Sequence, residues 1–295
     1  MELEKIKQVT VIGAGTMGSQ IAEVFSRVGK YAVTMVDTTD ERTNAGYQAI
    51  QTRLKKHFVE KGKMTTTEAD EVLARIKRTT DIGEASKNAD FVTEAVFENL
   101  ALKKSVFKQV DDAAASHAII ASNTSALSIT EMAATTKRPD KVVGTHYFNP
   151  VAVMKLVEVV RGALTSSETI DTTQALMQKL RKSPVVCKDT FGFLANRAHV
   201  AMVREAVQMV WERVAPPQDI DKALREGYNL PMGPLEVYDY TGGWAILASS
   251  EQDKVKELGE TGRLHPLVRM MIRAGYTGKP NKGIYDFWNE VLAKW

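Results

Sequence analysis

Residues 9–37 constrain the fold of this chain more than any other segment, because they hold the parts of a βαβ nucleotide-binding unit in order. An apolar run at residues 9–12 predicts a strand, and residues 21–28 carry apolar side chains at helical spacing. Between them stands the pattern G-x-G-x-x-G, formed by Gly13, Ala14, Gly15, Thr16, Met17 and Gly18. This order predicts a phosphate-binding turn at the start of the helix.

Each glycine of this motif has an expected task. Gly13 permits the tight turn, Gly15 lets a pyrophosphate approach the backbone, and Gly18 lets the helix pack closely on the strand. A second apolar run, at residues 32–36, ends in Asp37, about 20 residues beyond the glycines, where a carboxylate can receive a ribose 2′-hydroxyl. A purely structural glycine turn is the alternative, but the complete set of parts favours dinucleotide binding.

Asp37 also predicts which dinucleotide is preferred. Its carboxylate would repel a 2′-phosphate, and neither Thr38 nor Thr39 offers a positive charge, so we expect NAD(H) to be preferred over NADP(H). Arg42 would weaken that preference if it folded back toward the ribose and neutralised Asp37.

The composition is that of an ordinary globular protein with room for two domains: of 295 residues, 44% are hydrophobic and 25% are charged. No apolar run approaches the ~20 residues of a membrane helix, and the charged residues 1–8 do not resemble a secretory signal. The single cysteine, Cys187, excludes an internal disulfide and is expected to be a small buried residue. We therefore expect a cytoplasmic protein without a membrane span. The balanced net charge of +3 argues against a nucleic-acid surface.

A helical hairpin is expected at about residues 40–77, projecting from the nucleotide domain. One long helical pattern covers residues 39–61, with Thr38-x-x-Glu41 as a possible capping box, and a shorter one covers residues 67–76. A basic cluster lies near the turn between them: Lys55, Lys56, His57, Lys61 and Lys63. Taken alone, this cluster is a solvated basic face.

The next segments predict an α/β fold of the Rossmann type, with a doubly wound parallel sheet. Strand-like runs at residues 91–95, 119–122 and 142–146 alternate with helical segments at residues 101–115 and 128–134. Polar groups follow each of these strands, where ligands bind in such sheets. They are residues 94–98, 122–125 and 146–150.

Beyond residue 190 the pattern becomes entirely helical. Residues 153–161 form a mostly apolar segment interrupted by Lys155 and Glu158, and a helix and a short strand are expected at residues 169–180 and 184–188. Helical patterns then follow at residues 192–210, 218–226, 233–238, 244–257 and 266–273. We therefore expect an NAD-binding domain at residues 1–190 and an all-helical domain at residues 191–295.

His146 is the best candidate for a proton-transfer group beside a dinucleotide. It ends an apolar strand, where a satisfied core histidine is the alternative, whereas His57, His117, His199 and His265 are expected at the surface. Glu158, twelve residues further on, would be costly to bury alone, and a carboxylate beside an imidazole fixes its tautomer and favours its protonated form.

The motifs together resemble the 3-hydroxyacyl-CoA dehydrogenase family, particularly the short 3-hydroxybutyryl-CoA dehydrogenases of bacteria. The resemblance runs almost from end to end, in the family's order and spacing. It rests on G-A-G-T-M-G, E-A-V-F-E-N, A-S-N-T-S, G-T-H-Y-F-N-P-V, M-K-L-V-E-V-V, G-F-L-A-N-R and P-M-G-P-L-E.

The resemblance implies a reaction and a set of site residues. The reaction is the NAD-dependent interconversion of (3S)-3-hydroxyacyl-CoA and 3-ketoacyl-CoA, with His146 as catalytic base, Glu158 as its partner, and Ser125 and Asn196 contacting the substrate. It also implies a homodimer through the helical domain, an active site in the cleft between domains, and a coenzyme A contact at Lys61. The implied cofactor contacts are Gly13, Gly15, Thr16, Met17, Gly18, Asp37, Glu98, Lys103, Asn123, Ser125 and Asn149.

Several positions depart from the family's pattern. Ala126 stands where a second serine is usual, His57 lies near a position where some members carry lysine, and residues 239–244 and 283–288 differ from the usual motifs. Two rivals remain at this point. A lysine-dependent 3-hydroxyacid dehydrogenase shares the glycine motif, but its G-x-x-G-x-G-x-x-x-K motif is missing here. A crystallin-like relative without turnover would keep the fold, and the retained site residues argue against it.

Overall fold

The computed structural model describes residues 3–294, and the chain divides into two compact units with the boundary between Phe193 and Leu194. The first unit is an α/β structure. Its strands are β1 (Gln8–Ile12), β2 (Ala32–Val36), β3 (Ile76–Thr79), β4 (Phe91–Glu94), β5 (Ile119–Ser122), β6 (Val142–Tyr147), β7 (Leu156–Arg161) and β8 (Ser183–Lys188). Its α-helices are α1 (Thr16–Arg27), α2 (Asp40–Leu54), α3 (Thr66–Ala74), α4 (Ile82–Ser86), α5 (Leu100–Ala113), α6 (Ile129–Ala133) and α7 (Ser167–Lys179).

The strands form one sheet in the order β3-β2-β1-β4-β5-β6-β7-β8. All neighbours run parallel except β6 and β7, which are antiparallel. The strand order reverses direction at β1, so the chain is doubly wound from the centre, as the sequence predicts. The carboxyl ends of β1, β2, β4, β5 and β6 therefore lie along one edge of the sheet.

Helices cover both faces of this sheet, and alternate residues of each strand supply the two cores. On one face, Val9 and Val11 of β1 pack in a cluster with Phe25 of α1 and Met177 of α7. On the other face, Ile12 of β1 packs in a cluster with Phe107 of α5 and with α6 residues. Buried strands without polar faces are typical of parallel sheets.

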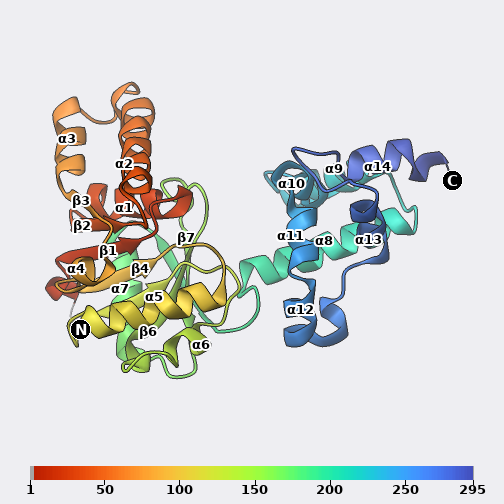
Figure 1. Cartoon of the computed structure of the whole chain (residues 1–295). Helices are drawn as coiled ribbons and strands as arrows, with labels where there is room; N and C mark the ends of the chain where they lie inside the picture. Colours follow the sequence, from red (N-terminus) through yellow and green to blue (C-terminus); the bar gives the residue numbers. More distant parts are fainter. Residues whose placement is uncertain (1–2, 295) are drawn as a thin grey trace. The chain divides into compact units, whose positions relative to one another are not determined.

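Helices α2 and α3 form an arm that projects from this unit, at the top of the view in Figure 1. The end of α2 is fixed to α1 by the fully buried Glu23, whose carboxylate accepts from Arg53 of α2 at 2.8 Å and from Arg27 at 3.3 Å. The Arg27 guanidinium also lies over the Phe58 ring, 4.2 Å from its centroid. Helix α1 therefore holds the arm.

Several expected boundaries are wrong at this arm. Helix α2 ends at Leu54 and continues as one π-type turn over Lys55–Val59, and its cap is Thr39, which accepts from the Arg42 amide, rather than Thr38. The expected helix at residues 67–76 ends at Ala74, because Ile76–Thr79 pairs with β2 as the edge strand β3. Strand β7 (Leu156–Arg161) also lies where no strand was predicted.

The second unit is helical, with a separate core around Trp244, Leu267 and Phe287. The expected helix at residues 244–257 is two helices, since the Ser250 hydroxyl at the break bonds to the Ile246 carbonyl and competes with the helix backbone. Among residues 3–294, no helix is long and apolar enough to cross a membrane. The helices are α8 (Ala195–Trp211), α9 (Pro217–Tyr228), α10 (Pro234–Thr241), α11 (Gly243–Ser249), α12 (Glu251–Leu258), α13 (Pro266–Arg273) and α14 (Ile284–Glu290).

His265 is expected to make the stability of the second unit depend on pH. It caps α13 by accepting from the Leu267 amide at 3.1 Å, and only the neutral ring can accept this bond. Burial, and then the charge of Arg204, lower the pKa of His265 below its usual 6.5. Because the unfolded chain takes up this proton at a higher pH than the folded chain, we expect the melting temperature to fall as pH drops from about 7 to 5.

Tryptophan fluorescence measures this transition, because all four tryptophans lie beyond residue 194. The matched variant His265→Asn keeps a capping oxygen and removes the titrating ring, so its melting temperature should depend less on pH. Burial also lowers the pKa of His199, so part of the dependence of the melting temperature on pH should remain in this variant. Identical slopes for the variant and the unchanged chain would show that His265 does not carry the effect.

Candidate active site

The glycine turn between β1 and α1 is shaped by two close backbone approaches. Gly13 has φ +102°, and a Cβ there would lie 2.5 Å from the Ala95 oxygen. A Cβ on Gly18 would lie 1.7 Å from the Gly13 oxygen. At Gly15, in contrast, an added Cβ would meet no described atom within 4 Å. The protein itself therefore requires glycine at two of the three positions and leaves the backbone open at the third.

This open backbone fits the phosphates of a dinucleotide. Gly15 is the N-cap residue of α1 and offers no side-chain cap, so the first amide groups of the helix have no side-chain acceptor there. Thr16, exposed, and Met17, half-buried, continue the first turn. Amide groups and the helix dipole at such an end attract anions.

Asp37 lies beside this turn at the end of β2. One carboxylate oxygen accepts from the Ala14 amide at 2.8 Å, and the other accepts from the Thr38 amide at 2.7 Å. A carboxylate can accept about four hydrogen bonds, so capacity remains for a ribose hydroxyl. Arg42 does turn back, with its Nη1 3.7 Å from Asp37 Oδ1, but its side chain is half exposed.

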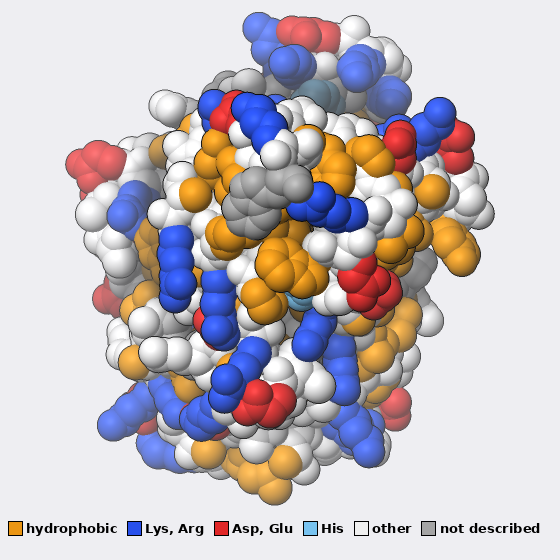
Figure 2. All heavy atoms as spheres, turned by 90° about the vertical axis from the view of Figure 1, so that its right-hand side faces the viewer, with side chains coloured by type: hydrophobic (Ala, Val, Ile, Leu, Met, Phe, Trp, Pro, Cys, Tyr) orange, Lys and Arg blue, Asp and Glu red, His pale blue; other side chains and the backbone are white. Residues whose placement is uncertain are grey.

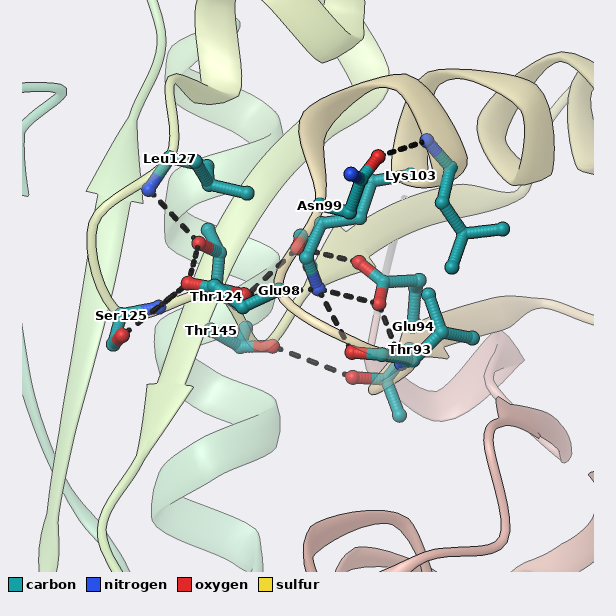
Figure 3. Close-up of polar contacts among 12 residues, drawn as sticks. Thr93, Glu94, Glu98, Asn99, Lys103, Thr124, Ser125, Leu127 and Thr145 are labelled. Carbon is teal, nitrogen blue, oxygen red and sulfur yellow. Dashed lines mark hydrogen bonds and ion pairs between the residues drawn. The ribbon is translucent and has the colours of Figure 1, made fainter. Parts of the chain in front are cut away.

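Lys103 forms a buried ionic centre beneath the loop after β4 (Figure 3). Its Nζ donates to Glu94 Oε1 at 2.7 Å and to the Val96 carbonyl at 3.3 Å, and it lies 3.2 Å from Glu98 Oε2. The Lys103 and Glu94 side chains are both 1% exposed. The three donors of the ammonium are thus used inside the protein, so Lys103 acts at the surface through Glu98. Its direct contact with the cofactor stays a prediction.

Glu98 links Lys103 to the loop after β5. It accepts from the Thr124 hydroxyl at 2.6 Å and from the Ser125 amide and hydroxyl at 2.9 and 3.2 Å (Figure 3). Burial opposes ionisation, but the Lys103 charge and these hydrogen bonds hold the pKa of Glu98 below its usual value. Glu98 is therefore a charged acceptor that fixes the position of Ser125.

His146 and Glu158 lie side by side because β6 and β7 are antiparallel. Their register pairs His146 directly with Glu158, and the side chains meet with His146 Nδ1 2.6 Å from Glu158 Oε2. His146 is 6% exposed and Glu158 is fully buried. The spacing of twelve residues therefore follows from this register and from the connection of residues 148–155 between the two strands.

This contact determines which imidazole nitrogen is available for chemistry. An ionised carboxylate is only an acceptor, so Nδ1 carries the proton and Nε2 of the neutral ring keeps its lone pair. The rings of Phe148 and Phe193 pack against the imidazole, with centroids 4.4 and 5.9 Å away, and restrict its orientation. The arrangement can accept a proton at Nε2 and stabilise the resulting imidazolium.

The remaining cysteine and histidines are not suited to this role. Cys187 is buried as expected, and burial followed by the Glu158 charge raises the pKa of its thiol to about 11. His117 is exposed and pairs with Asp90. His199 and His265 are half-buried in the second unit, so the expectation that both are surface residues is wrong: His199 packs on Tyr238 and His265 caps a helix.

The other predicted site residues occupy three places. Asn123 and Asn149 follow β5 and β6 at the edge of the sheet that carries the glycine turn. Lys61 is exposed in the turn of the arm, and Asn196 lies in the first turn of α8, in the second unit. Glu94 was expected only as part of the polar group at residues 94–98, and it is buried instead; Gln20, a polar side chain on the buried side of α1, had no predicted role.

A dinucleotide turn and a buried histidine–carboxylate pair at one edge of a doubly wound sheet define a class, the nicotinamide-dependent dehydrogenases. Comparison with known families narrows the class. The NAD-binding domain of 3-hydroxyacyl-CoA dehydrogenase matches residues 8–190, and the C-terminal domain of the same family matches residues 192–287. The chain therefore belongs to the 3-hydroxyacyl-CoA dehydrogenase family, and it is an NAD-binding oxidoreductase, as the motifs predict.

Similar proteins cover nearly the whole chain. A probable 3-hydroxybutyryl-CoA dehydrogenase of Bacillus subtilis is 44% identical over 285 residues, which are 96% of this chain and 98% of the relative. The 3-hydroxybutyryl-CoA dehydrogenase of Clostridioides difficile is 40% identical over 95% of this chain and 99% of its own length. The crystal structure of (S)-3-hydroxybutyryl-CoA dehydrogenase from Ralstonia eutropha matches with a TM-score of 0.90 and 38% identity, covering 95% of this chain and 99% of that one.

Proposed function

We propose that this chain interconverts (3S)-3-hydroxyacyl-CoA and 3-ketoacyl-CoA, with 3-hydroxybutyryl-CoA and acetoacetyl-CoA as its substrates. The observation that carries the proposal is the 2.6 Å contact between His146 and the buried Glu158. The full-length similarity to 3-hydroxybutyryl-CoA dehydrogenases supports the choice of substrate.

The proposed mechanism uses His146 Nε2 as the base. It removes the proton from the 3-hydroxyl while the hydride leaves C3, and the negative charge of Glu158 stabilises the imidazolium that forms. Bound NAD⁺ supplies the hydride acceptor. In the reverse direction the imidazolium returns its proton to the developing alkoxide.

Hydrogen-bond donors are proposed to hold the substrate during this step. The Ser125 hydroxyl, placed by Glu98, and the Asn196 amide would donate to the reacting oxygen or position the thioester. Ala126 offers no further hydroxyl beside Ser125.

A turnover assay with acetoacetyl-CoA and NADH tests this function. We expect NADH oxidation with the CoA thioester and none with free acetoacetate. Activity only on the free acid would favour the lysine-dependent 3-hydroxyacid dehydrogenases, and binding of NADH without turnover would favour a non-catalytic relative. A series of acyl-CoA lengths then defines the acyl-chain preference.

The basic cluster on the arm is proposed to bind the phosphates of coenzyme A. Lys55, Lys56, His57, Lys61 and Lys63 are all exposed, and Lys and Arg side chains gather at the end of the arm, at the top of Figure 2. Replacing Lys61 with Ala should raise KM for acetoacetyl-CoA and leave kcat unchanged, and the difference should shrink with salt, because exposed charges are screened over roughly 10 Å at 0.1 M.

A truncated pantetheine thioester provides the control for Lys61. It lacks the nucleotide phosphates, so its kcat/KM should be little affected by Lys61→Ala. Equal losses for the two thioesters would mean that Lys61 acts elsewhere.

Preference for NAD(H) over NADP(H) is the second prediction for this site. The Asp37 carboxylate is held by the Ala14 and Thr38 amides beside the glycine turn, and its negative charge would repel a 2′-phosphate at the adenosine ribose. Arg42 is 3.7 Å away and half exposed, so it screens this charge only in part. Replacing Arg42 with Ala should increase the ratio of kcat/KM for NADH to that for NADPH. Comparable kcat/KM values for the two cofactors in the unchanged chain would defeat the prediction.

A homodimer through the second unit and a cytoplasmic location are also proposed. Several large apolar side chains of this unit are exposed, and burying them against a second copy would be favourable. They include Met202, Trp211, Val214, Tyr228, Tyr240 and Ile246. Sedimentation of the full chain distinguishes a monomer from a dimer.

A further inference from the structure

Gln20 ties the first turn of α1 to the loop that follows His146. Its side chain is buried, only 7% exposed, and makes three hydrogen bonds. Nε2 donates to the Thr16 carbonyl at 3.0 Å and to Asn149 Oδ1 at 2.9 Å, and Oε1 accepts from the Val151 amide at 2.8 Å. One side chain therefore connects the phosphate-binding turn with the end of β6.

The direction of these hydrogen bonds is fixed by backbone groups. The Thr16 carbonyl can only accept and the Val151 amide can only donate, so the Gln20 amide cannot be reversed. Gln20 thus presents an N–H to Asn149, and Asn149 must turn its oxygen toward Gln20. The two N–H groups of Asn149 are left on the other side of its planar amide. Asn149 is exposed, and within residues 3–294 these groups have no hydrogen-bond acceptor.

Asn123, at the end of the neighbouring strand β5, has the same orientation. Its Oδ1 accepts from the Tyr147 amide at 2.9 Å, another group that can only donate. The Asn123 amide nitrogen is therefore also directed away from the backbone of β6. Two side-chain amides thus offer donors at the ends of adjacent strands.

The sheet order indicates which half of a dinucleotide these donors meet. Asp37 follows β2, on one side of β1, and is placed for the ribose of the adenosine half. Strands β5 and β6 lie on the other side of β1. A dinucleotide whose pyrophosphate lies at the start of α1 between them extends its nicotinamide half toward β5 and β6.

We propose that Gln20 is a positioning residue for the nicotinamide half of the cofactor. It holds the Asn149 amide with its N–H groups outward, so that Asn149 and Asn123 donate to acceptor oxygens of the nicotinamide nucleoside. The inference rests on the proposed dehydrogenase function for its purpose, but it concerns cofactor binding alone. It can therefore fail while acetoacetyl-CoA turnover succeeds, and the reverse.

The variant Gln20→Glu tests the direction of the Asn149 amide. The introduced carboxylate has nearly the same shape and still accepts from the Val151 amide. When ionised it cannot donate, so Asn149 must turn its N–H groups inward and present its oxygen to the cofactor. The Asn149 oxygen then faces an acceptor oxygen of the nicotinamide nucleoside. We therefore expect the dissociation constant of NADH to rise roughly 10- to 100-fold. The dissociation constant of ADP-ribose, which lacks the nicotinamide, should rise much less, since this ligand meets only the added charge and the lost bond to the Thr16 carbonyl.

Acid should restore NADH binding to this variant. A buried carboxyl group protonates more readily than an exposed one, and its O–H then donates to Asn149 as the amide did. The ratio of the NADH dissociation constants of the variant and the unchanged chain should therefore fall as pH is lowered from about 8 to 6. Titration calorimetry measures both ligands, and circular dichroism verifies that the variant is folded.

Gln20→Met separates a positioning role from a merely structural one. Methionine neither donates nor accepts here, so Asn149 is free to turn either way, and NADH binding should suffer less than in Gln20→Glu. Asn149→Asp keeps the oxygen that faces Gln20 and removes the donors, so it should also weaken NADH and spare ADP-ribose. Equal losses for NADH and ADP-ribose, a greater loss in Gln20→Met than in Gln20→Glu, or unchanged NADH binding in Asn149→Asp would each overturn the proposal.

Discussion

Replacing His146 with Ala should lower kcat/KM for acetoacetyl-CoA reduction by roughly 10² to 10⁴, the usual contribution of a positioned acid or base. Affinity for NADH should survive, because the proposed cofactor contacts near β6 come from the side chains of Asn123 and Asn149 and not from the His146 ring. Steady-state kinetics and NADH titration of the purified variant measure the two quantities. A loss of NADH affinity as large as the loss of kcat/KM would mean that the substitution disturbs the cofactor site.

Glu158 should contribute only through His146. Glu158→Gln keeps the shape of the side chain but withdraws the negative charge that stabilises the imidazolium, so kcat/KM should also fall. In the double variant, the loss should scarcely exceed that of His146→Ala alone, because residues that act as one unit are strongly non-additive. If the two losses multiply while the fold stays intact, Glu158 instead has a structural role or contacts the substrate directly.

Replacing Lys103 with Met should destabilise the first unit by roughly 3–5 kcal/mol, the usual cost of removing one partner from a buried ion pair. Methionine has a similar shape, but it leaves the Glu94 carboxylate buried without its cation. Equilibrium unfolding in urea, followed by far-ultraviolet circular dichroism, measures the change. Part of the loss should return in the double variant Glu94→Gln/Lys103→Met.

The neighbouring Lys104 provides a matched control for Lys103. It pairs with Glu131 at the same distance, 2.7 Å, but both side chains are partly exposed. Solvent screens such a pair, so Lys104→Met should cost at most about 1 kcal/mol. Equal and small losses in the two variants would show that burial does not set the energy of the Lys103 centre.

The fold class follows from local patterns that the sequence displays directly. The run at residues 119–122 is β5 without a change of boundary, and the helix predicted at Pro266–Arg273 is α13. Strands β3 and β7 were missed because their character depends on partners. Arg78 and Lys77 in β3 are exposed at the edge of the sheet, and Glu158 in β7 is buried opposite His146, its register partner on β6.

In the candidate site, too, the sequence indicates some of the residues but not the contacts that they make. His146 and Glu158 could be chosen from residue type and position, since an acid in an apolar segment requires a partner. The role of Glu94 could not be predicted, because an acid at a strand end can contact a ligand as well as an internal partner. Only the structure shows that Lys103 and the Ser122 hydroxyl occupy its carboxylate, at 2.7 Å each. Gln20 was overlooked because its three partners are distant in sequence or belong to the backbone.

Helix α1 connects two proposed binding surfaces, the glycine turn for the dinucleotide and the basic cluster for coenzyme A. Its first turn carries the amides proposed to bind the cofactor phosphates, while Glu23 and Arg27, further along the helix, contact Arg53 and Phe58 of the arm that carries the basic cluster. A helix that moves as a rigid body changes position at both of its ends together. If the basic cluster binds the thioester as proposed, we therefore expect binding at the arm and binding of the dinucleotide to be coupled through α1.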